Sequence, residues 1–280
     1  MKTADKIRLA GALYRLIKNV RRPFGWEDQV QVVRNGFCWD LDLAEGIDLA
    51  IFAFGSYERK TGKVLQRLVG TGSTVLDIGA NIGAHTLRLG RLVGPTGKVY
   101  AFEPTDCAFR KLKRNLELNP EIASRVVAEQ VRLIGNRQLE SSDEIYSSWK
   151  VVGADVRHPK HFGIAQSTSG ARAMTLDRYC QQQGIARVDF VKLDVDGFEC
   201  EVIAGGMKVL ERDRPKICME LAPYVLAERG SSLDELLSLL DQCEYKLTDL
   251  SNGRTLTCDP VELNAKIPDG AGINVMAVPA

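Results

Sequence analysis

The chain has 280 residues, of which 45% are hydrophobic and 26% are charged, so it can build one large domain, or one domain with an N-terminal addition. Its 37 basic and 36 acidic residues leave a net charge of +1, which excludes a global electrostatic attraction to nucleic acid. No apolar run approaches the roughly 20 residues that span a bilayer, no signal-peptide core is present, and the 7 cysteines are scattered without a Cys-x-x-Cys pair. We therefore expect a cytoplasmic protein with reduced thiols.

The first predicted element is a basic amphipathic helix over residues 5–22. Its apolar residues recur at helical spacing, and lysines and arginines surround them. Such a helix can lie on an anionic membrane surface, but most helices of this kind dock on their own domain or on a partner subunit. We expect it to pack on the core, with peripheral membrane contact or a homodimer interface as the alternatives.

A hairpin and a second helix follow. Residues 30–43 hold two strand-like runs around Asn35-Gly36, which is a strong signal for a tight turn. The segment Gly55-Ser56-Tyr57-Glu58 then leads into an amphipathic helix over about residues 59–69. We assign residues 1–70 to an N-terminal extension that packs on the core, and residues 71–280 to the main domain.

The stretch Val75-Leu76-Asp77-Ile78-Gly79-Ala80-Asn81-Ile82-Gly83 predicts a buried strand, a glycine turn and the start of a helix over about residues 83–93. The glycines let the backbone approach a ligand, and the helix would aim its free amides at a carboxylate or phosphate. A strand at 98–102, a helix at 106–118 and a strand near 126–134 follow. This alternation predicts an α/β fold with a doubly wound, mainly parallel sheet.

Residues 135–173 break the alternation because they are polar and rich in serine. We predict a lid-like insertion there, since long loops in compact domains are often functional or disordered. The alternation then resumes, with helices predicted at about 176–183, 201–211 and 233–240 and strands at 188–193, 216–221, 245–250 and 273–278.

Acidic residues at the ends of predicted strands form the candidate site, since open parallel sheets bind ligands outside the carboxyl ends of their strands. They are Asp77, Glu103, Asp194, Asp196 and Glu220. Glu103 lies 20 residues beyond Gly83, the offset at which an acidic side chain accepts hydrogen bonds from ribose hydroxyls. Asn81 stands where a dinucleotide site would need glycine, so the turn favours a ligand without a diphosphate. S-adenosylmethionine fits, because its cationic sulfonium tolerates surrounding carboxylates.

Six motifs, in this order, resemble those of the FkbM-type S-adenosylmethionine-dependent methyltransferases, over roughly residues 30–280. They are Gly-x-Tyr-Glu at 55–58, the glycine-turn motif extended through Ala84-His85-Thr86, Phe-Glu-Pro at 102–104, Thr-Leu-Asp at 175–177, Val-Lys-Leu-Asp-Val-Asp-Gly-Phe-Glu at 191–199 and Met-Glu-Leu at 219–221. The resemblance implies a class I methyltransferase fold, with a Rossmann-like sheet of seven strands whose last strand is antiparallel. It also implies O-methylation of a hydroxyl on a sugar, a glycan or a polyketide-like natural product.

The motifs predict a set of cofactor contacts. It comprises Tyr57, Glu58, Asp77, Gly79, Asn81, Gly83, Thr86, Glu103, Pro104 and Asp194. For catalysis, in-line methyl transfer needs an oriented acceptor and help in removing its proton. Asp194 is the first candidate for either role, because it follows the predicted strand that ends nearest the transferring methyl. His85 is a second candidate base, whose alternative role is to pack beside the cofactor.

Three further charged residues have two possible roles each. Asp196 is a catalytic candidate, but with Glu199 it can instead cap the following helix. Lys192 is also a catalytic candidate, whose more natural role is to neutralise the carboxylates around it. Glu220 and Asp194 end neighbouring predicted strands and could hold one magnesium ion as hard oxygen ligands.

Two other function classes stay open. An NAD(P)-dependent oxidoreductase would use a similar sheet, but Asn81 disfavours it. A catalytically silent scaffold would keep the fold for partner binding, but the intact Asp77, Glu103 and Asp194 disfavour it. We expect acceptor choice to reside in the N-terminal helix and in the 135–173 insertion.

Overall fold

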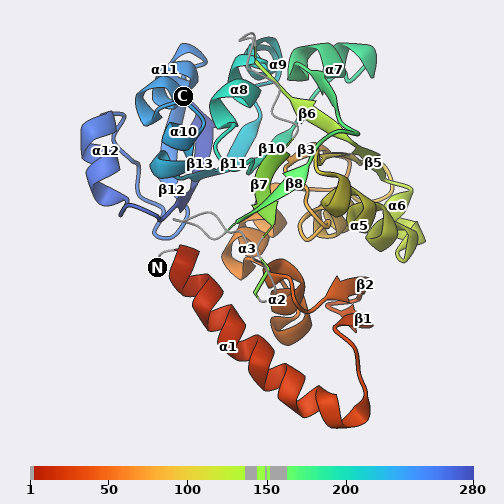
Figure 1. Ribbon diagram of the computed structural model, residues 1–280. Coiled ribbons are helices and arrows are strands. Elements are labelled where there is room, and N and C mark those ends of the chain that lie inside the picture. The colour runs from red at the N-terminus through yellow and green to blue at the C-terminus, as the bar shows by residue number, and fades with distance from the viewer. Residues whose placement is uncertain (1–2, 136–143, 149, 152–162) are drawn as a thin grey trace.

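The computed structural model describes residues 3–135, 144–148, 150–151 and 163–280. At its centre is a seven-stranded sheet with the strand order β12-β13-β11-β10-β3-β4-β5 (Figure 1). The strands are β3 (Thr74–Ile78), β4 (Lys98–Phe102), β5 (Val126–Glu129), β10 (Phe190–Leu193), β11 (Lys216–Leu221), β12 (Tyr245–Asp249) and β13 (Ile273–Pro279). The last strand, β13, pairs antiparallel with both β11 and β12. This arrangement confirms the predicted class I methyltransferase sheet.

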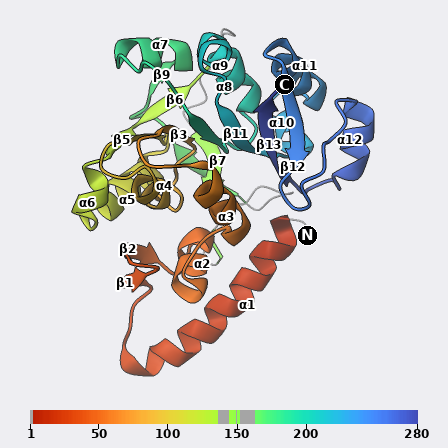
Figure 2. The ribbon, with the colours of Figure 1, turned by 180° about the vertical axis from the view of Figure 1, so that it is seen from behind.

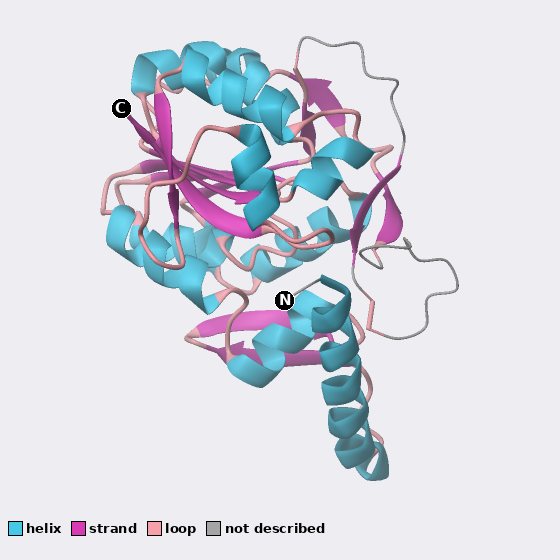
Figure 3. Ribbon diagram, turned by 90° about the vertical axis from the view of Figure 1, so that its left-hand side faces the viewer, coloured by secondary structure: helices cyan, strands magenta, loops and turns pink. Residues whose placement is uncertain are grey.

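Helices cover both faces of the sheet (Figure 3). They are α3 (Arg59–Leu68), α4 (Thr86–Leu92), α5 (Asp106–Glu117), α6 (Pro120–Ala123), α7 (Leu176–Gln182), α8 (Glu199–Ala204), α9 (Met207–Asp213), α10 (Pro223–Glu228), α11 (Leu233–Gln242) and α12 (Pro260–Lys266). Leu76 and Ile78 of β3 pack in a core with α7, α8, α9, α11 and α12, whereas Val75 packs with α3 and α4. Since side chains alternate along a strand, Asp77 lies on the same face as Val75.

The N-terminal region consists of α1 (Thr3–Arg21), the short helix η1 (Arg22–Phe24), the hairpin β1 (Gln29–Arg34) and β2 (Phe37–Asp42), and α2 (Gly46–Phe54). Asn35 and Gly36 both have positive φ (51° and 72°), as the tight turn between β1 and β2 requires. The hairpin is tied to the helices beside the main sheet. The backbone amide of Asp40 donates to the side chain of Asn115 in α5 (2.8 Å), and that of Cys38 donates to the side chain of Asn119 directly before α6 (3.0 Å). Figure 2 shows α1 on the outer side of this region.

Three predicted elements differ from the structure. The helix after the glycine turn begins at Thr86 rather than at Gly83. The strand predicted over 126–134 breaks at Gln130, whose carbonyl accepts from the amide of Arg172, and its second part, β6 (Val131–Leu133), pairs with β9 (Arg172–Met174) outside the main sheet. The helix predicted over 201–211 is interrupted between α8 and α9, where a Cβ on Gly205 would lie 2.2 Å from the carbonyl oxygen of Ile134.

Part of the predicted insertion forms a second hairpin, made of β7 (Glu144–Ser148) and β8 (Ile164–Ser167). Residues 136–143, 149 and 152–162 of the insertion lie outside the described residues. None of the helices in the described part of the chain combines the length and the apolar character that crossing a bilayer requires.

Candidate active site

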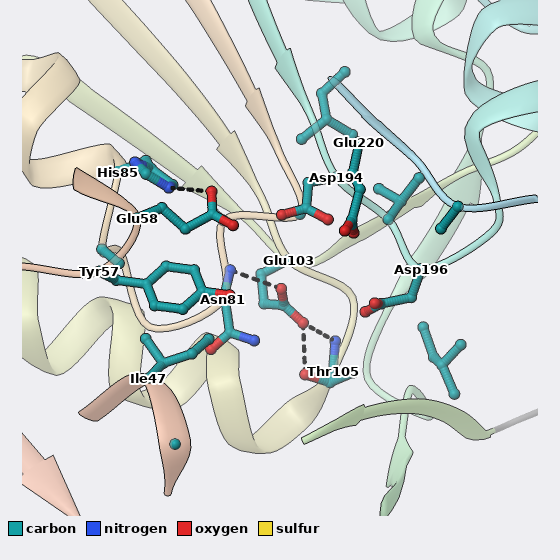
Figure 4. Close-up of a pocket in the computed structure, with 18 of the residues that line it drawn as sticks. Ile47, Tyr57, Glu58, Asn81, His85, Glu103, Thr105, Asp194, Asp196 and Glu220 are labelled. Atoms are coloured by element: carbon teal, nitrogen blue, oxygen red, sulfur yellow. Dashed lines mark hydrogen bonds and ion pairs between the residues drawn. The ribbon is translucent and has the colours of Figure 1, made fainter. Parts of the chain in front are cut away.

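A cavity of about 370 Å³ lies at the carboxyl ends of β3, β4, β10 and β11. That volume is within the range of small-molecule sites. Eleven of the residues predicted from the sequence line it, namely Tyr57, Glu58, Gly79, Asn81, His85, Glu103, Pro104, Lys192, Asp194, Asp196 and Glu220. The fold therefore brings four separate motifs, and the glycine turn, to one place (Figure 4).

The glycine turn is held tightly against the end of β10. Gly79 has φ +80°, and a Cβ at this position would lie 1.7 Å from the backbone oxygen of Asp194. Asn81 also has a positive φ of 49°, and its backbone N–H donates to Glu103 Oε2 at 2.9 Å. A side chain at position 79 would fill the space between the two strand ends, so only glycine leaves this backbone open to a ligand.

Glu103 is a buried carboxylate, 3% exposed, at the end of β4. Besides the bond from Asn81, its Oε1 accepts hydrogen bonds from Thr105 N (2.9 Å) and Thr105 Oγ1 (2.5 Å). Burial raises the pKa of Glu103, although these hydrogen bonds favour the carboxylate. A carboxylate has about four acceptor sites, so Glu103 keeps capacity for a ligand hydroxyl. Thr105 was not among the site residues predicted from the sequence. Its position directly before a predicted helix, where threonine is a preferred residue, was the signal that could have drawn attention to it.

Three predicted cofactor contacts do not line the cavity. Thr86 Oγ1 donates to Asp77 Oδ2 at 2.7 Å, and both side chains are fully buried behind the turn. A Cβ on Gly83 would lie 2.9 Å from Leu112 of α5, so this glycine allows close helix packing. The Gly83 amide donates to Ala80 O rather than pointing freely to a ligand. In this structure these residues support the turn.

Lys192 is a buried cation that joins the strand ends. Its Nζ donates to Gly79 O (3.1 Å) and lies 3.2 Å from Asp194 Oδ2 and 3.9 Å from Asp77 Oδ1. Burial alone would lower the pKa of Lys192, but Asp194 and Asp77 hold it above its usual value. A permanently protonated lysine cannot accept a proton, so this geometry fits the neutralising role.

Glu58 and His85 form a pair at one side of the cavity. His85 Nε2 lies 3.6 Å from Glu58 Oε2, which also accepts from Thr61 Oγ1 at 3.0 Å. Burial would raise the pKa of Glu58, but His85, Lys192 and Thr61 lower it to about 2. Glu58 is therefore an ionised carboxylate at neutral pH. In Figure 4 Glu58 lies between His85 and the centre of the cavity, so His85 contacts the carboxylate from behind.

Opposite this pair, Asp194, Asp196 and Glu220 form an acidic wall. Burial, followed by the charges of Asp194 and Glu220, raises the pKa of Asp196 well above its usual value. Burial and the charge of Asp194 raise the pKa of Glu220 to about 8. The predicted capping role of Asp196 is wrong, because the residue at the N-cap of α8 is Phe198 and makes no side-chain cap. Glu199 does stabilise the turn, since its Oε1 accepts from Val195 N at 3.2 Å.

The predicted magnesium ligands do lie at the ends of neighbouring strands, since Asp194 follows β10 and Glu220 is the penultimate residue of β11. Asp194 is already paired with the ammonium group of Lys192 at 3.2 Å, which would repel a divalent cation. Within residues 3–135, 144–148, 150–151 and 163–280, no group of three or more His, Cys, Asp or Glu side chains is arranged to hold a metal ion. These residues do not fit a magnesium site, and we derive no step through a metal.

The N-terminal region, where we expect part of the acceptor choice to reside, lines the cavity with apolar side chains that the sequence did not single out. They come from α1 and α2 and include Ile7, Leu9, Ala10, Leu13, Ile47 and Ala50. The signal for α2 was present, since Ile47, Ala50 and Phe54 recur at helical spacing.

The donor set fits S-adenosylmethionine. The Gly79 turn allows close approach of a ligand, Glu103 can accept from ribose hydroxyls, and the acidic wall suits a cationic sulfur. A model of the methyltransferase FkbM domain matches residues 77–247. The 2-O-methyltransferase NoeI of Sinorhizobium fredii (strain NBRC 101917 / NGR234) is 28% identical over 180 residues, which cover 61% of this chain and 72% of NoeI.

Two further proteins are similar. The methyltransferase sdnD of Sordaria araneosa is 30% identical over 155 residues, 47% of this chain and 59% of sdnD. The crystal structure of methyltransferase FkbM from Methylobacillus flagellatus KT aligns with a TM-score of 0.44 and 17% identity, over 74% of this chain and 43% of that chain.

Proposed function

Because this chain belongs to the FkbM family of methyltransferases, we propose that it transfers the methyl group of S-adenosylmethionine to a hydroxyl oxygen of a sugar, glycan or polyketide-like acceptor. One observation carries the proposal: a single cavity joins the glycine turn and Glu103 to the acidic wall that contains Asp194. The similarity to NoeI, a 2-O-methyltransferase, supports oxygen as the accepting atom. Family membership removes the oxidoreductase alternative.

S-adenosylmethionine, when bound, supplies an electrophilic methyl group on a cationic sulfur. Glu103 would accept hydrogen bonds from the ribose hydroxyls. Glu58, which is ionised because its pKa is lowered to about 2, would bind the α-ammonium group of the methionine part. His85 then acts as a positioning residue, because it contacts Glu58 from the side away from the cavity centre.

Asp194 is the residue best placed to handle the acceptor. As the acceptor oxygen bonds to the methyl carbon, the carbon–sulfur bond breaks and the hydroxyl proton leaves to a base. Lys192 fixes the Asp194 carboxylate from one side at 3.2 Å, and the other side faces the cavity. We assign Asp194 to hydrogen-bond the hydroxyl, orient it and take up its proton.

Kinetics of two variants test this division of roles. Asp194→Asn keeps the shape but removes the base, so kcat should fall by about 100-fold or more, while binding of S-adenosylhomocysteine changes far less. His85→Gln should raise the KM for S-adenosylmethionine and leave kcat within about threefold, because it acts through cofactor binding. If His85→Gln lost turnover and Asp194→Asn kept it, the proton acceptor would be His85.

A further inference from the structure

The N-terminal helix α1 has two apolar faces. Ile7 and Tyr14 belong to the inner face and are buried, and Tyr14 packs with Leu43 and Leu49. This inner face accounts for the docking on the core that its sequence predicts. A second row of large apolar side chains has no such cover.

We call this second row the outer apolar surface. It consists of Leu9, Leu16 and Val20 of α1 and of Phe24 and Trp26 beyond the helix, which are 65%, 64%, 61%, 65% and 57% exposed. Steps of seven and four residues place Leu9, Leu16 and Val20 on one side of a helix. The rings of Phe24 and Trp26 stack with centroids 4.9 Å apart. Figures 1 and 2 show that α1 lies on the outside of the molecule and that its C-terminal end is far from the sheet.

Positive charge is concentrated along the same segment. Residues 5–22 contain one acidic residue, Asp5, and six basic ones, whereas the whole chain has a net charge of only +1. The basic residues are Lys6, Arg8, Arg15, Lys18, Arg21 and Arg22. Asp28 offsets one of these charges through its pair with Lys18 at 3.2 Å. An apolar row flanked by basic side chains, with an exposed tryptophan, is typical of helices that lie at a membrane surface.

We propose that the outer apolar surface docks on an anionic lipid bilayer, with α1 lying along the membrane plane. Leu16, Val20 and Phe24 would enter the region between headgroups and acyl chains. The basic residues other than Lys6, which lines the cavity, would contact anionic headgroups. A second copy of the chain suits this surface less well, because two copies would bring the same basic segments together.

Docking would also orient the cavity. Leu9 belongs to the outer apolar surface and lines the cavity together with Ile7 and Leu13. A bilayer against α1 would therefore lie beside the cavity entrance. If the protein transfers methyl groups to oxygen as proposed, this orientation favours an acceptor whose hydroxyl belongs to an amphiphile that stays in the membrane. This step of the inference rests on the proposed function.

Vesicle sedimentation tests the docking without any measurement of activity. The unaltered protein should sediment with vesicles of phosphatidylcholine and phosphatidylglycerol, and only weakly with phosphatidylcholine alone. Raising the ionic strength to about 1 M should release much of it, because the Debye length falls to roughly 3 Å. On binding, the emission of Trp26 should shift to the blue, and Trp26→Phe should remove that shift.

Two matched variants make the test specific. Leu16→Glu should weaken vesicle binding by about tenfold or more, because it places a charge where docking would bury an apolar side chain in the bilayer. Val261→Glu, at a valine of α12 that is also exposed (78%), should bind vesicles like the unaltered protein. Circular dichroism and S-adenosylhomocysteine binding serve as controls for folding in both variants, and they also report separately on the cofactor site.

Three results would overturn the proposal. The first is that the unaltered protein does not bind anionic vesicles. The second is that Leu16→Glu and Val261→Glu bind vesicles equally well. The third is that light scattering shows a dimer that Leu16→Glu separates and vesicles leave intact, which would identify a second copy as the occupant.

Discussion

Glu103 shows how a few hydrogen bonds prepare one side chain for its ligand. Asn81 and Thr105 hold both carboxylate oxygens, so the side chain need not reorganise when a ribose arrives. The sequence could predict Glu103 because its distance from the glycine turn is fixed by one strand and one helix. It could not predict that Asp77 and Thr86 turn toward each other, because that contact depends on how far the turn runs before α4 begins at Thr86.

Replacing Glu103 should weaken cofactor binding. We expect Glu103→Ala to cost about 1–3 kcal/mol of binding free energy for S-adenosylhomocysteine, because the ribose hydroxyls lose a buried acceptor. Isothermal titration calorimetry measures this directly. Glu117→Ala, at an exposed residue paired only at the surface with Arg114, is the matched control and should leave the affinity unchanged. Equal affinities for the two variants would rule out the ribose contact.

Glu220 should make discrimination between donor and product depend on pH. Burial and Asp194 raise its pKa to about 8, so it is mostly protonated at neutral pH and becomes a carboxylate above that value. The carboxylate attracts the sulfonium of S-adenosylmethionine but not the neutral sulfur of S-adenosylhomocysteine. The affinity ratio should therefore rise about fivefold or more as the pH passes 8, since a nearby charge pair contributes on the order of 1 kcal/mol even at high dielectric.

Glu220→Gln provides the comparison, because it cannot ionise. Its ratio of the affinities for S-adenosylmethionine and S-adenosylhomocysteine should stay flat over the same pH range. If the affinity ratio of donor to product rose equally with pH in Glu220→Gln, a group other than Glu220 would cause the effect.

The ionisation of Glu220 also affects folding. The pKa of Glu220 in the folded protein exceeds its usual value of 4.5, so the stability that the protonated side chain contributes is complete below about 4.5 and is lost as the pH rises through about 8.

At the scale of elements, the strands could be predicted because each is a short apolar run with a polar end. The breaks within two predicted elements could not be predicted, because each is caused by a contact with a residue that is distant in the sequence. Gly205 separates α8 from α9 where the backbone of Ile134 passes, and Gln130 breaks a strand by bonding to Arg172. The local hydrophobic periodicity of a helix or strand contains no information on which other segment of the chain will pack against it.

The turn between β3 and α4 should tolerate no side chain at Gly79. Gly79→Ala combines a positive φ with a contact of 1.7 Å to the backbone oxygen of Asp194, so we expect a loss of about 2–4 kcal/mol of unfolding free energy. Gly230→Ala is the control, because Gly230 has φ +74° but no atom within 4 Å of the added Cβ. It should cost only about 1 kcal/mol. Urea denaturation measures both, and equal losses would mean that the close approach to Asp194 relaxes freely.

At the scale of the whole molecule, the residues that line one half of the cavity were predictable, whereas for the other half only the participation of the N-terminal helix was expected. The half at the strand ends follows from the fold, because the last residues of all parallel strands lie at the same edge of the sheet. The half formed by α1 and α2 depends on how the N-terminal region packs across that edge. Its apolar side chains line the same cavity as the acidic wall, so the site combines a polar reaction centre with an apolar lining.

The atom that receives the methyl group decides whether the protein is an O-methyltransferase. The purified protein is incubated with S-adenosylmethionine labelled with carbon-13 in its methyl group and with sugar, glycan and polyketide fractions, and the carbon chemical shift of the product identifies the atom that received the label. We predict an ether methyl, formed by the unaltered protein and lost in Asp194→Asn while S-adenosylhomocysteine still binds. A methyl on nitrogen or carbon, or an ether methyl formed equally well by Asp194→Asn, would contradict the account.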